Sequence, residues 1–300
     1  VADAAIPQAD AFVAFRGRRA DLFDGARPAA EVAMVESRPS RAHNSIEPYV
    51  AGILGMNALL AGHVPFDLID DPDDEDLDRY KLLFLPDAEC MSDESVRKLM
   101  SFVERGGALV LTGETSRYDV WRRRRPDLAL APMLGQAAGY MSFERMPPDT
   151  VLRGEWGQGR FVYMRRLASE VPVDDFEHCT DGPNIHPEMW RLAQNHQALI
   201  SGVRWAGEGR LTLQVHGPTG LAAEWRTTPD GRGIVHLVNY HLHEPARGVA
   251  VDVPAGAHSA ARLWSPWEHE PAEVAPAKAG AGKMRVEVGE VARYAVLELK

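Results

Sequence analysis

The stretch LLFLPDAECMSDESVRKLMSFVERGGALVLTGETSRYD, residues 82–119, decides the fold class of this chain. Its hydrophobic spacing predicts a buried strand at 80–86, a helix at 92–107 and a second buried strand at 108–113. Ser92 stands where a helix N-cap is expected, because its hydroxyl can accept a hydrogen bond from the first turn. The segment is therefore predicted to be one strand–helix–strand unit of a parallel sheet.

The same alternation continues on both sides of this unit. It predicts an α/β domain over residues 30–202, with a parallel sheet and helices on both faces. The stretch 114–158 has no clear pattern and is expected to be irregular and partly exposed. The other predicted elements are strands at 30–37, 65–70 and 159–164 and helices at 45–63 and 187–200.

The pattern changes after residue 202. Short alternating runs follow one another, separated by turn signals such as PDGRG at 229–233, and no helical pattern interrupts them. This predicts an all-β sandwich domain over residues 203–300. Residues 1–29 are expected to be a connecting segment, with helical spacing over 9–24.

Composition excludes several classes of protein. The 300 residues are 45% hydrophobic and carry a formal net charge of −10, which disfavours a general binder of nucleic acid or anionic membranes. No apolar run is long enough to span a membrane. The chain begins without Met and without a signal peptide, so a longer protein trimmed upstream is expected, and the cytoplasm is favoured as its compartment. The run WRRRRP at 121–126 is interpreted as a solvated loop or as an ion-pair partner of the acidic run at 70–78.

A Cys–His–Glu set is one candidate for catalysis. Cys90 lies where a strand passes into a helix, and the stretch NIHPEMW places His186 two residues before Glu188. A catalytic thiolate needs a sharp strand–helix turn, usually built with glycine, and a lowered pKa. The neighbours of Cys90, AECMS, contain no glycine and bring negative charge from Glu89. The set therefore stands only as an alternative hypothesis.

Ligand-binding candidates are expected at the carboxyl edge of the sheet, where open α/β sheets bind ligands. The loop at 176–188 has polar side chains but no zinc spacing, so no metal is expected. No glycine-rich phosphate loop follows the first strand, so neither a nucleotide nor another cofactor is expected. Cys90 and Cys179 give no disulfide framework, and a single bridge between them stays open. The ligand-binding candidates are His43, Glu114, His178, Asp181 and His186.

The α/β half resembles the flavodoxin-like, class I glutamine amidotransferase-like fold. In that family one strand ends in a turn that helps form the oxyanion site, and the next strand carries the nucleophile elbow. On this chain, LLFLPDAE at 82–89 takes the first place and LVLTGETSR at 109–117 takes the second, with Glu114 or Thr115 at the nucleophile position. Cys90 then lies one element too early. The resemblance implies that the fold is kept and the catalytic set is lost.

The order of the two halves resembles the C-terminal part of the trimeric bacterial β-galactosidases and related glycoside hydrolases. The motifs that carry this resemblance are FVERGGALVLTG at 102–113 and HLVNY at 236–240, and it covers nearly all of residues 25–300. It implies an amidotransferase-like trimerisation domain without the triad, followed by a small β-sandwich. In such enzymes the catalytic carboxylates belong to an upstream (β/α)8 barrel, which this sequence does not contain.

The resemblance predicts a non-catalytic assembly portion of a β-galactosidase-like glycoside hydrolase. Its expected partners are further copies of itself in a trimer, and the upstream barrel, either covalently joined or as a separate chain. The portion would also shape a neighbouring active site. Two alternatives stay open: a cysteine hydrolase that uses Cys90, His186 and Glu188, and a carbohydrate-binding module. The module would bind sugars through the tryptophans of the β-sandwich, Trp225, Trp264 or Trp267.

Overall fold

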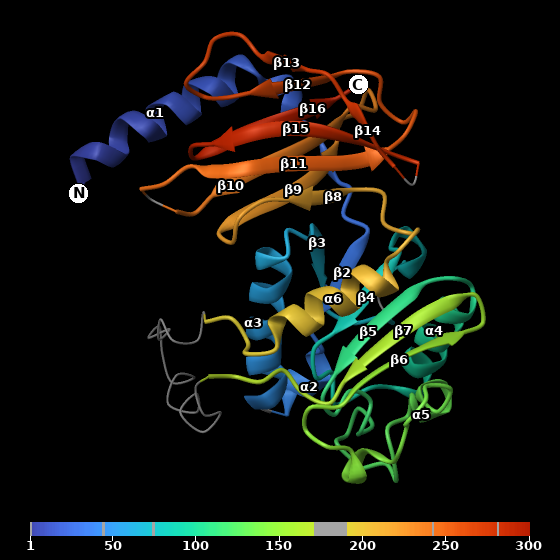
Figure 1. Cartoon of the computed structure of the whole chain (residues 1–300). Helices are drawn as coiled ribbons and strands as arrows, with labels where there is room; N and C mark the ends of the chain where they lie inside the picture. The colour runs from blue at the N-terminus through green and yellow to red at the C-terminus, as the bar shows by residue number, and fades with distance from the viewer. Residues whose placement is uncertain (1, 44–45, 74–75, 171–190, 242, 281) are drawn as a thin grey trace. The chain divides into compact units, whose positions relative to one another are not determined.

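The computed structural model describes the chain except for residues 1, 44–45, 74–75, 171–190, 242 and 281. It divides into two compact units, an α/β domain and a β-rich domain (Figure 1). The α/β unit consists of Glu31–Leu59 and Phe66–Leu211. The β-rich unit consists of Val1–Ala30, Leu60–Pro65 and Thr212–Lys300.

The α/β unit is built on a six-stranded sheet with the order β3-β2-β4-β5-β7-β6. Strands β3, β2, β4, β5 and β7 are parallel, and β6 runs antiparallel to β7. The sheet is thus mixed, and the prediction of a parallel sheet is corrected at this edge. The strands are β2 (Val32–Val35), β3 (Phe66–Ile69), β4 (Leu82–Leu85), β5 (Ala108–Thr112), β6 (Val151–Trp156) and β7 (Gly159–Met164).

Strand β6 was not predicted because its sequence, VLRGEW, is that of an exposed edge. The apolar residue Val151 is exposed, and Gly154, on the inner face, has no side chain, so apolar and polar residues do not alternate clearly in the sequence. Gly154 sits against Phe161 of β7, and a Cβ at this glycine would lie 2.4 Å from the ring. The glycine therefore lets the edge strand approach its neighbour closely.

Helix α4 confirms the prediction made from its sequence. It runs from Asp93 to Glu104, and Ser92 Oγ accepts a hydrogen bond from Ser95 N at 2.8 Å. The predicted helix at 187–200 is corrected: residues 191–195 precede the helix, which begins at His196. The Asn195 side chain bonds to Arg166 O and Ala168 N, which fixes a loop there instead.

None of the described helices is long and apolar enough to cross a membrane. The α/β unit contains further helical elements, which are short or lie against the sheet. They are α2 (Arg38–Ala42), α3 (Ile46–Ala61), α5 (Ala131–Leu134), α6 (His196–Ala206) and the 3-10 turns η2 (Leu77–Arg79) and η3 (Phe143–Arg145).

Successive side chains of a strand point to opposite faces of the sheet. The central strands are apolar on both faces, and helices cover both of them. On one face, α4 packs in a core cluster with the odd-numbered residues Leu109, Leu111 and Phe161. On the other face, Gly55 of α3 lies against Phe84, and Gly202 of α6 lies against Val162. These glycines let the two helices pack close to the strands.

The β-rich unit contains two antiparallel sheets that share one apolar core. Val235 and Leu297 come from the first sheet, and Val251 and Val286 come from the second. The first sheet has the order β1-β9-β10-β16-β12-β13 and the second β14-β15-β11-β8. Their strands are β1 (Arg27–Pro28), β8 (Gln214–His216), β9 (Leu221–Thr227), β10 (Gly233–Asn239), β11 (Ala246–Pro254), β12 (Ala261–Trp264), β13 (Ala272–Val274), β14 (Ala277–Gly280), β15 (Lys283–Val291) and β16 (Tyr294–Leu299).

The N-terminal segment belongs to the β-rich unit. It forms α1 (Ala2–Arg18) and the turn η1 (Ala20–Leu22). Phe15 and Leu22 are buried in one cluster with Ile234 and Val296, whose side chains project from the first sheet. The segment therefore covers the sheet face that does not meet the second sheet.

Candidate functional site

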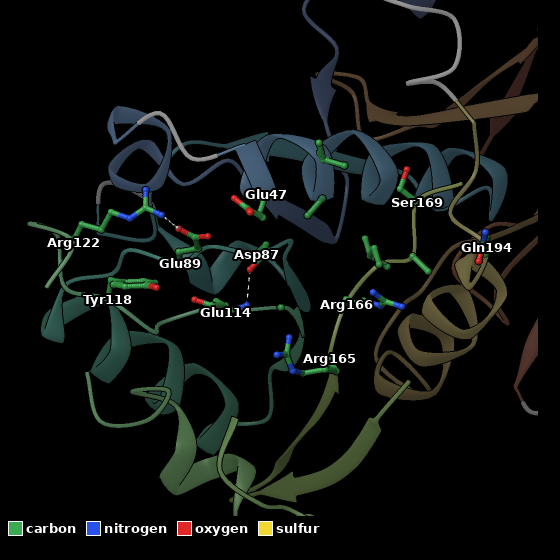
Figure 2. Close-up of a pocket in the computed structure, with 15 residues that line it drawn as sticks. Glu47, Asp87, Glu89, Glu114, Tyr118, Arg122, Arg165, Arg166, Ser169 and Gln194 are labelled. Atoms are coloured by element: carbon green, nitrogen blue, oxygen red, sulfur yellow. Dashed lines mark hydrogen bonds and ion pairs between the residues drawn. The ribbon is translucent and has the colours of Figure 1, made fainter. Parts of the chain in front are cut away.

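A pocket of about 510 Å³ opens in the α/β unit at the carboxyl ends of the strands (Figure 2). The chain passes from β2 outward to β3 and then returns to β4 on the other side of β2, and this reversal of strand order leaves a crevice. The charged and phenolic lining comes from four segments: Glu47 from α3, Asp87 and Glu89 after β4, Glu114, Tyr118 and Arg122 after β5, and Arg165 and Arg166 after β7.

The turns after β4 and β5 are locked together beneath the pocket. Asp87 has a positive φ of 50°, and its amide donates to Thr112 Oγ1 at 3.1 Å. Glu114 N donates to Asp87 Oδ1 at 2.5 Å, and Ala88 N donates to Thr115 Oγ1 at 3.1 Å. Thr115 is fully buried, and its hydroxyl oxygen is used within the turn as the acceptor for Ala88 N. Of the two residues predicted at the nucleophile position, only Glu114 lines the pocket.

The carboxyl groups of the pocket differ in charge. Burial, and then the charge of Glu89, raises the pKa of Asp87 to about 8, so Asp87 holds its proton at neutral pH. Glu89 is nearly buried and forms an ion pair with Arg122 at 3.3 Å. Burial and the charge of Glu114 raise the pKa of Tyr118, which keeps its hydroxyl protonated. Among the described residues, no three His, Cys, Asp or Glu side chains are grouped to hold a metal ion.

Asp87→Asn is expected to flatten the pH dependence of the free energy of unfolding. Because folding raises the pKa of Asp87 from 3.8 to about 8, the folded chain keeps a proton that the unfolded chain loses in this window. The wild-type free energy of unfolding should therefore fall as the pH rises towards 8. Asparagine keeps an oxygen for Glu114 N and does not titrate. Urea unfolding at about pH 5 and about pH 8 measures the difference; an equal slope in both proteins would contradict the assignment.

The structure separates the residues predicted from sequence. Glu114 lines the pocket, whereas His43 lies at the end of α2 with Nε2 3.1 Å from Val120 O, outside the lining. Cys90 carries a free, buried thiol that does not line the pocket either. Burial, and then the charge of Glu89, raises the pKa of this thiol and opposes a thiolate. The remaining predicted residues, His178, Cys179, Asp181, His186 and Glu188, lie outside the described part of the chain.

Sequence reasoning missed Asp87 and the two arginines Arg165 and Arg166. A usable signal was present, because each follows the end of a buried strand, in LPDAE and in YMRR. Their convergence depends on the strand order, in which β4, β5 and β7 are neighbours. That order is not visible in the local pattern.

The basic run forms a fixed turn beside the pocket. Three of its four arginines form ion pairs within the α/β unit, Arg122 with Glu89, Arg124 with Glu144 and Arg125 with Asp93. These partners differ from the acidic run at 70–78, which was one of the two interpretations made from the sequence, the other being a solvated loop.

Trp121 projects from this turn. Asp119 Oδ1 accepts hydrogen bonds from Trp121 N and from Arg123 N, both at 2.9 Å. The turn thus has a defined backbone, yet the Trp121 side chain is 73% exposed.

The tryptophans proposed for sugar binding have different surroundings. Trp264 donates to Glu298 at 2.9 Å, and the guanidinium of Arg19 lies 3.4 Å from the centre of its ring. Trp225 packs, partly buried, against the core between the sheets. Trp267 is 44% exposed, so of the three it presents the most open ring.

Part of the chain that lines the pocket matches a known family of protein domains. Residues 56–173 match a family model described as the beta-galactosidase trimerisation domain. No curated protein matches the sequence of the chain.

Solved structures share the fold over most of the chain. A GH42 β-galactosidase from G. stearothermophilus has a TM-score of 0.56 and 16% identity, covering 91% of this chain and 41% of that one. A β-galactosidase from Bacillus circulans sp. alkalophilus has a TM-score of 0.54 and 16% identity, covering 93% and 42%. An α-L-fucosidase isoenzyme 2 from Paenibacillus thiaminolyticus has a TM-score of 0.61 and 14% identity, covering 96% and 51%.

At these identities the structural likeness shows the fold alone. The chain spans about two fifths of the length of the β-galactosidases that it matches. The family match covers the strands from β3 to β7 and the turns after β4, β5 and β7 that line the pocket, whereas Glu47 of α3 lies outside it. The match over residues 56–173 and the shared fold confirm the resemblance predicted from the sequence, which is to the C-terminal part of a GH42-like glycoside hydrolase.

Proposed function

We propose that this chain is the non-catalytic assembly portion of a β-galactosidase-like glycoside hydrolase and holds its copies together as a trimer. The observation that carries the proposal is the match of residues 56–173 to the trimerisation domain. An upstream (β/α)8 barrel, in the same or another chain, would perform the hydrolysis. The α/β unit would line part of a neighbouring active-site cleft.

Three features support the absence of a catalytic nucleophile from the amidotransferase-like fold that the sequence predicts. The nucleophile position of such a fold would be taken by Glu114 or Thr115, and of these Glu114 is a carboxylic acid and Thr115 is buried in the turn. Cys90, the alternative nucleophile, is buried and has a raised pKa. A buried thiol beside negative charge is a poor nucleophile, so the cysteine hydrolase has less support than the assembly role.

Light scattering on the intact 300-residue chain tests the assembly role. We expect a mass three times the 33.1 kDa of one chain, independent of concentration over the micromolar range. A monomer at every concentration would overturn the proposal.

A further inference from the structure

We infer that the pocket at the carboxyl edge of the α/β sheet binds a small, neutral, polyhydroxylated molecule the size of one or two sugar rings. The volume of about 510 Å³ lies within the usual range for small-molecule sites. This site is distinct from the assembly role and does not depend on it.

Arg165 carries a hydrogen-bond donor that the described residues leave unused. Its Nε atom is buried and has no hydrogen-bond partner among the described residues. The residue is held in place, because its amide donates to Thr150 O at 2.9 Å and its guanidinium lies 3.6 Å from the centre of the Phe143 ring. Arg165 also lines the pocket (Figure 2). Buried donors are normally satisfied, so this Nε marks Arg165 as a side chain of the pocket lining whose hydrogen-bonding capacity the described residues do not fully use.

The balance of charge around the pocket favours a neutral ligand. Glu89 and Arg122 neutralise each other. Asp87 is neutral at neutral pH, because its pKa is about 8. Two carboxylates, Glu47 and Glu114, then face two guanidiniums, Arg165 and Arg166. A strongly charged ligand of either sign would meet both attraction and repulsion here.

The lining groups match the chemistry of a hydroxyl. A carboxylate such as Glu114 only accepts hydrogen bonds and a guanidinium such as Arg165 only donates them, whereas each hydroxyl of a polyol does both. Tyr118 adds a phenolic hydroxyl and a flat ring, and such rings pack against the apolar faces of sugars. Vicinal hydroxyls can therefore bridge the acidic and basic sides of the pocket.

Calorimetric titration of the intact chain with D-galactose and D-glucose tests the inference, with D-galacturonate as an anionic comparator. We expect saturable binding of at least one neutral sugar, and binding of the acid at least about tenfold weaker. Glu114→Gln and Arg165→Met should each weaken the binding of the neutral sugar by about tenfold or more, because each removes a charged hydrogen-bonding group.

A matched control uses Glu155→Gln on β6, in the same unit, where the side chain is 73% exposed and outside the lining. It should leave the affinity unchanged, and thermal unfolding should show that every variant is folded. Three results would overturn the inference: no saturation by either neutral sugar, tighter binding of galacturonate, or binding that survives both pocket substitutions. The last result would show that any sugar-binding site lies elsewhere on the chain.

Discussion

Trp121→Ala is expected to turn the proposed trimer into monomers at micromolar concentration. The side chain is 73% exposed, yet its turn is fixed by the two hydrogen bonds to Asp119. A large aromatic side chain on a turn with a fixed backbone loses little backbone entropy on contact, and tryptophan is a typical anchor of an interface. It also lies inside the segment that matches the trimerisation domain.

The expected size of this effect follows from the behaviour of such anchors. Truncating a central tryptophan weakens an interface by about 2–4 kcal/mol, or roughly thirtyfold to a thousandfold in each contact. In a closed ring every contact is the same, so each interface loses one anchor. Light scattering over a dilution series measures the loss.

Trp267→Ala is the matched control, because Trp267 is also exposed but belongs to the β-rich unit. The control variant should keep the mass of the wild type. If Trp121→Ala keeps that mass as well, the turn is not the anchor of the assembly.

Gly113→Ala is expected to cause a large loss of stability in the α/β unit. Gly113 has a φ of +62°, which an alanine adopts only with strain. A Cβ there would lie 2.2 Å from Asp87 Oδ1 and 2.4 Å from Oδ2. Asp87 cannot move aside freely, because Oδ1 accepts the hydrogen bond from Glu114 N. Backbone strain and overpacking together should lower the free energy of unfolding by about 3–5 kcal/mol.

Gly139→Ala separates the effect of backbone strain from the effect of overpacking. Gly139 also has a positive φ, +83°, but no atom lies within 4 Å of a Cβ at this position. Its substitution should lower the free energy of unfolding only through backbone strain, by about 1–2 kcal/mol. Urea unfolding of both variants gives the comparison. Equal losses would show that the contact with Asp87 is relieved without strain.

Local sequence was sufficient where an element is determined by its own residues. The helix at Asp93–Glu104 and the buried strands on either side of it follow from capping and from apolar periodicity. Strand β6 was not predictable in this way, because its partner β7 and the contact of Gly154 with Phe161 decide its place. An exposed edge strand carries little hydrophobic signal.

The pocket was predictable only in part. Glu114 was found because it follows a strand, as the rule for open α/β sheets suggests. The proton on Asp87 depends on burial and on Glu89, which only the folded chain supplies. The unused donor of Arg165 likewise depends on Phe143, which is far away in sequence.

The edges of the α/β sheet limit how copies of this chain can associate. Strand β6 turns Arg153 and Glu155 outward, and β3 is short and carries Asp67, which pairs with Arg79. Charged and short edge strands resist the addition of a strand from another molecule. Chains separated by loss of their contact should then stay dispersed, rather than join through their backbones into aggregates. A dissociated variant would accordingly be a tractable, non-aggregating species for measurement.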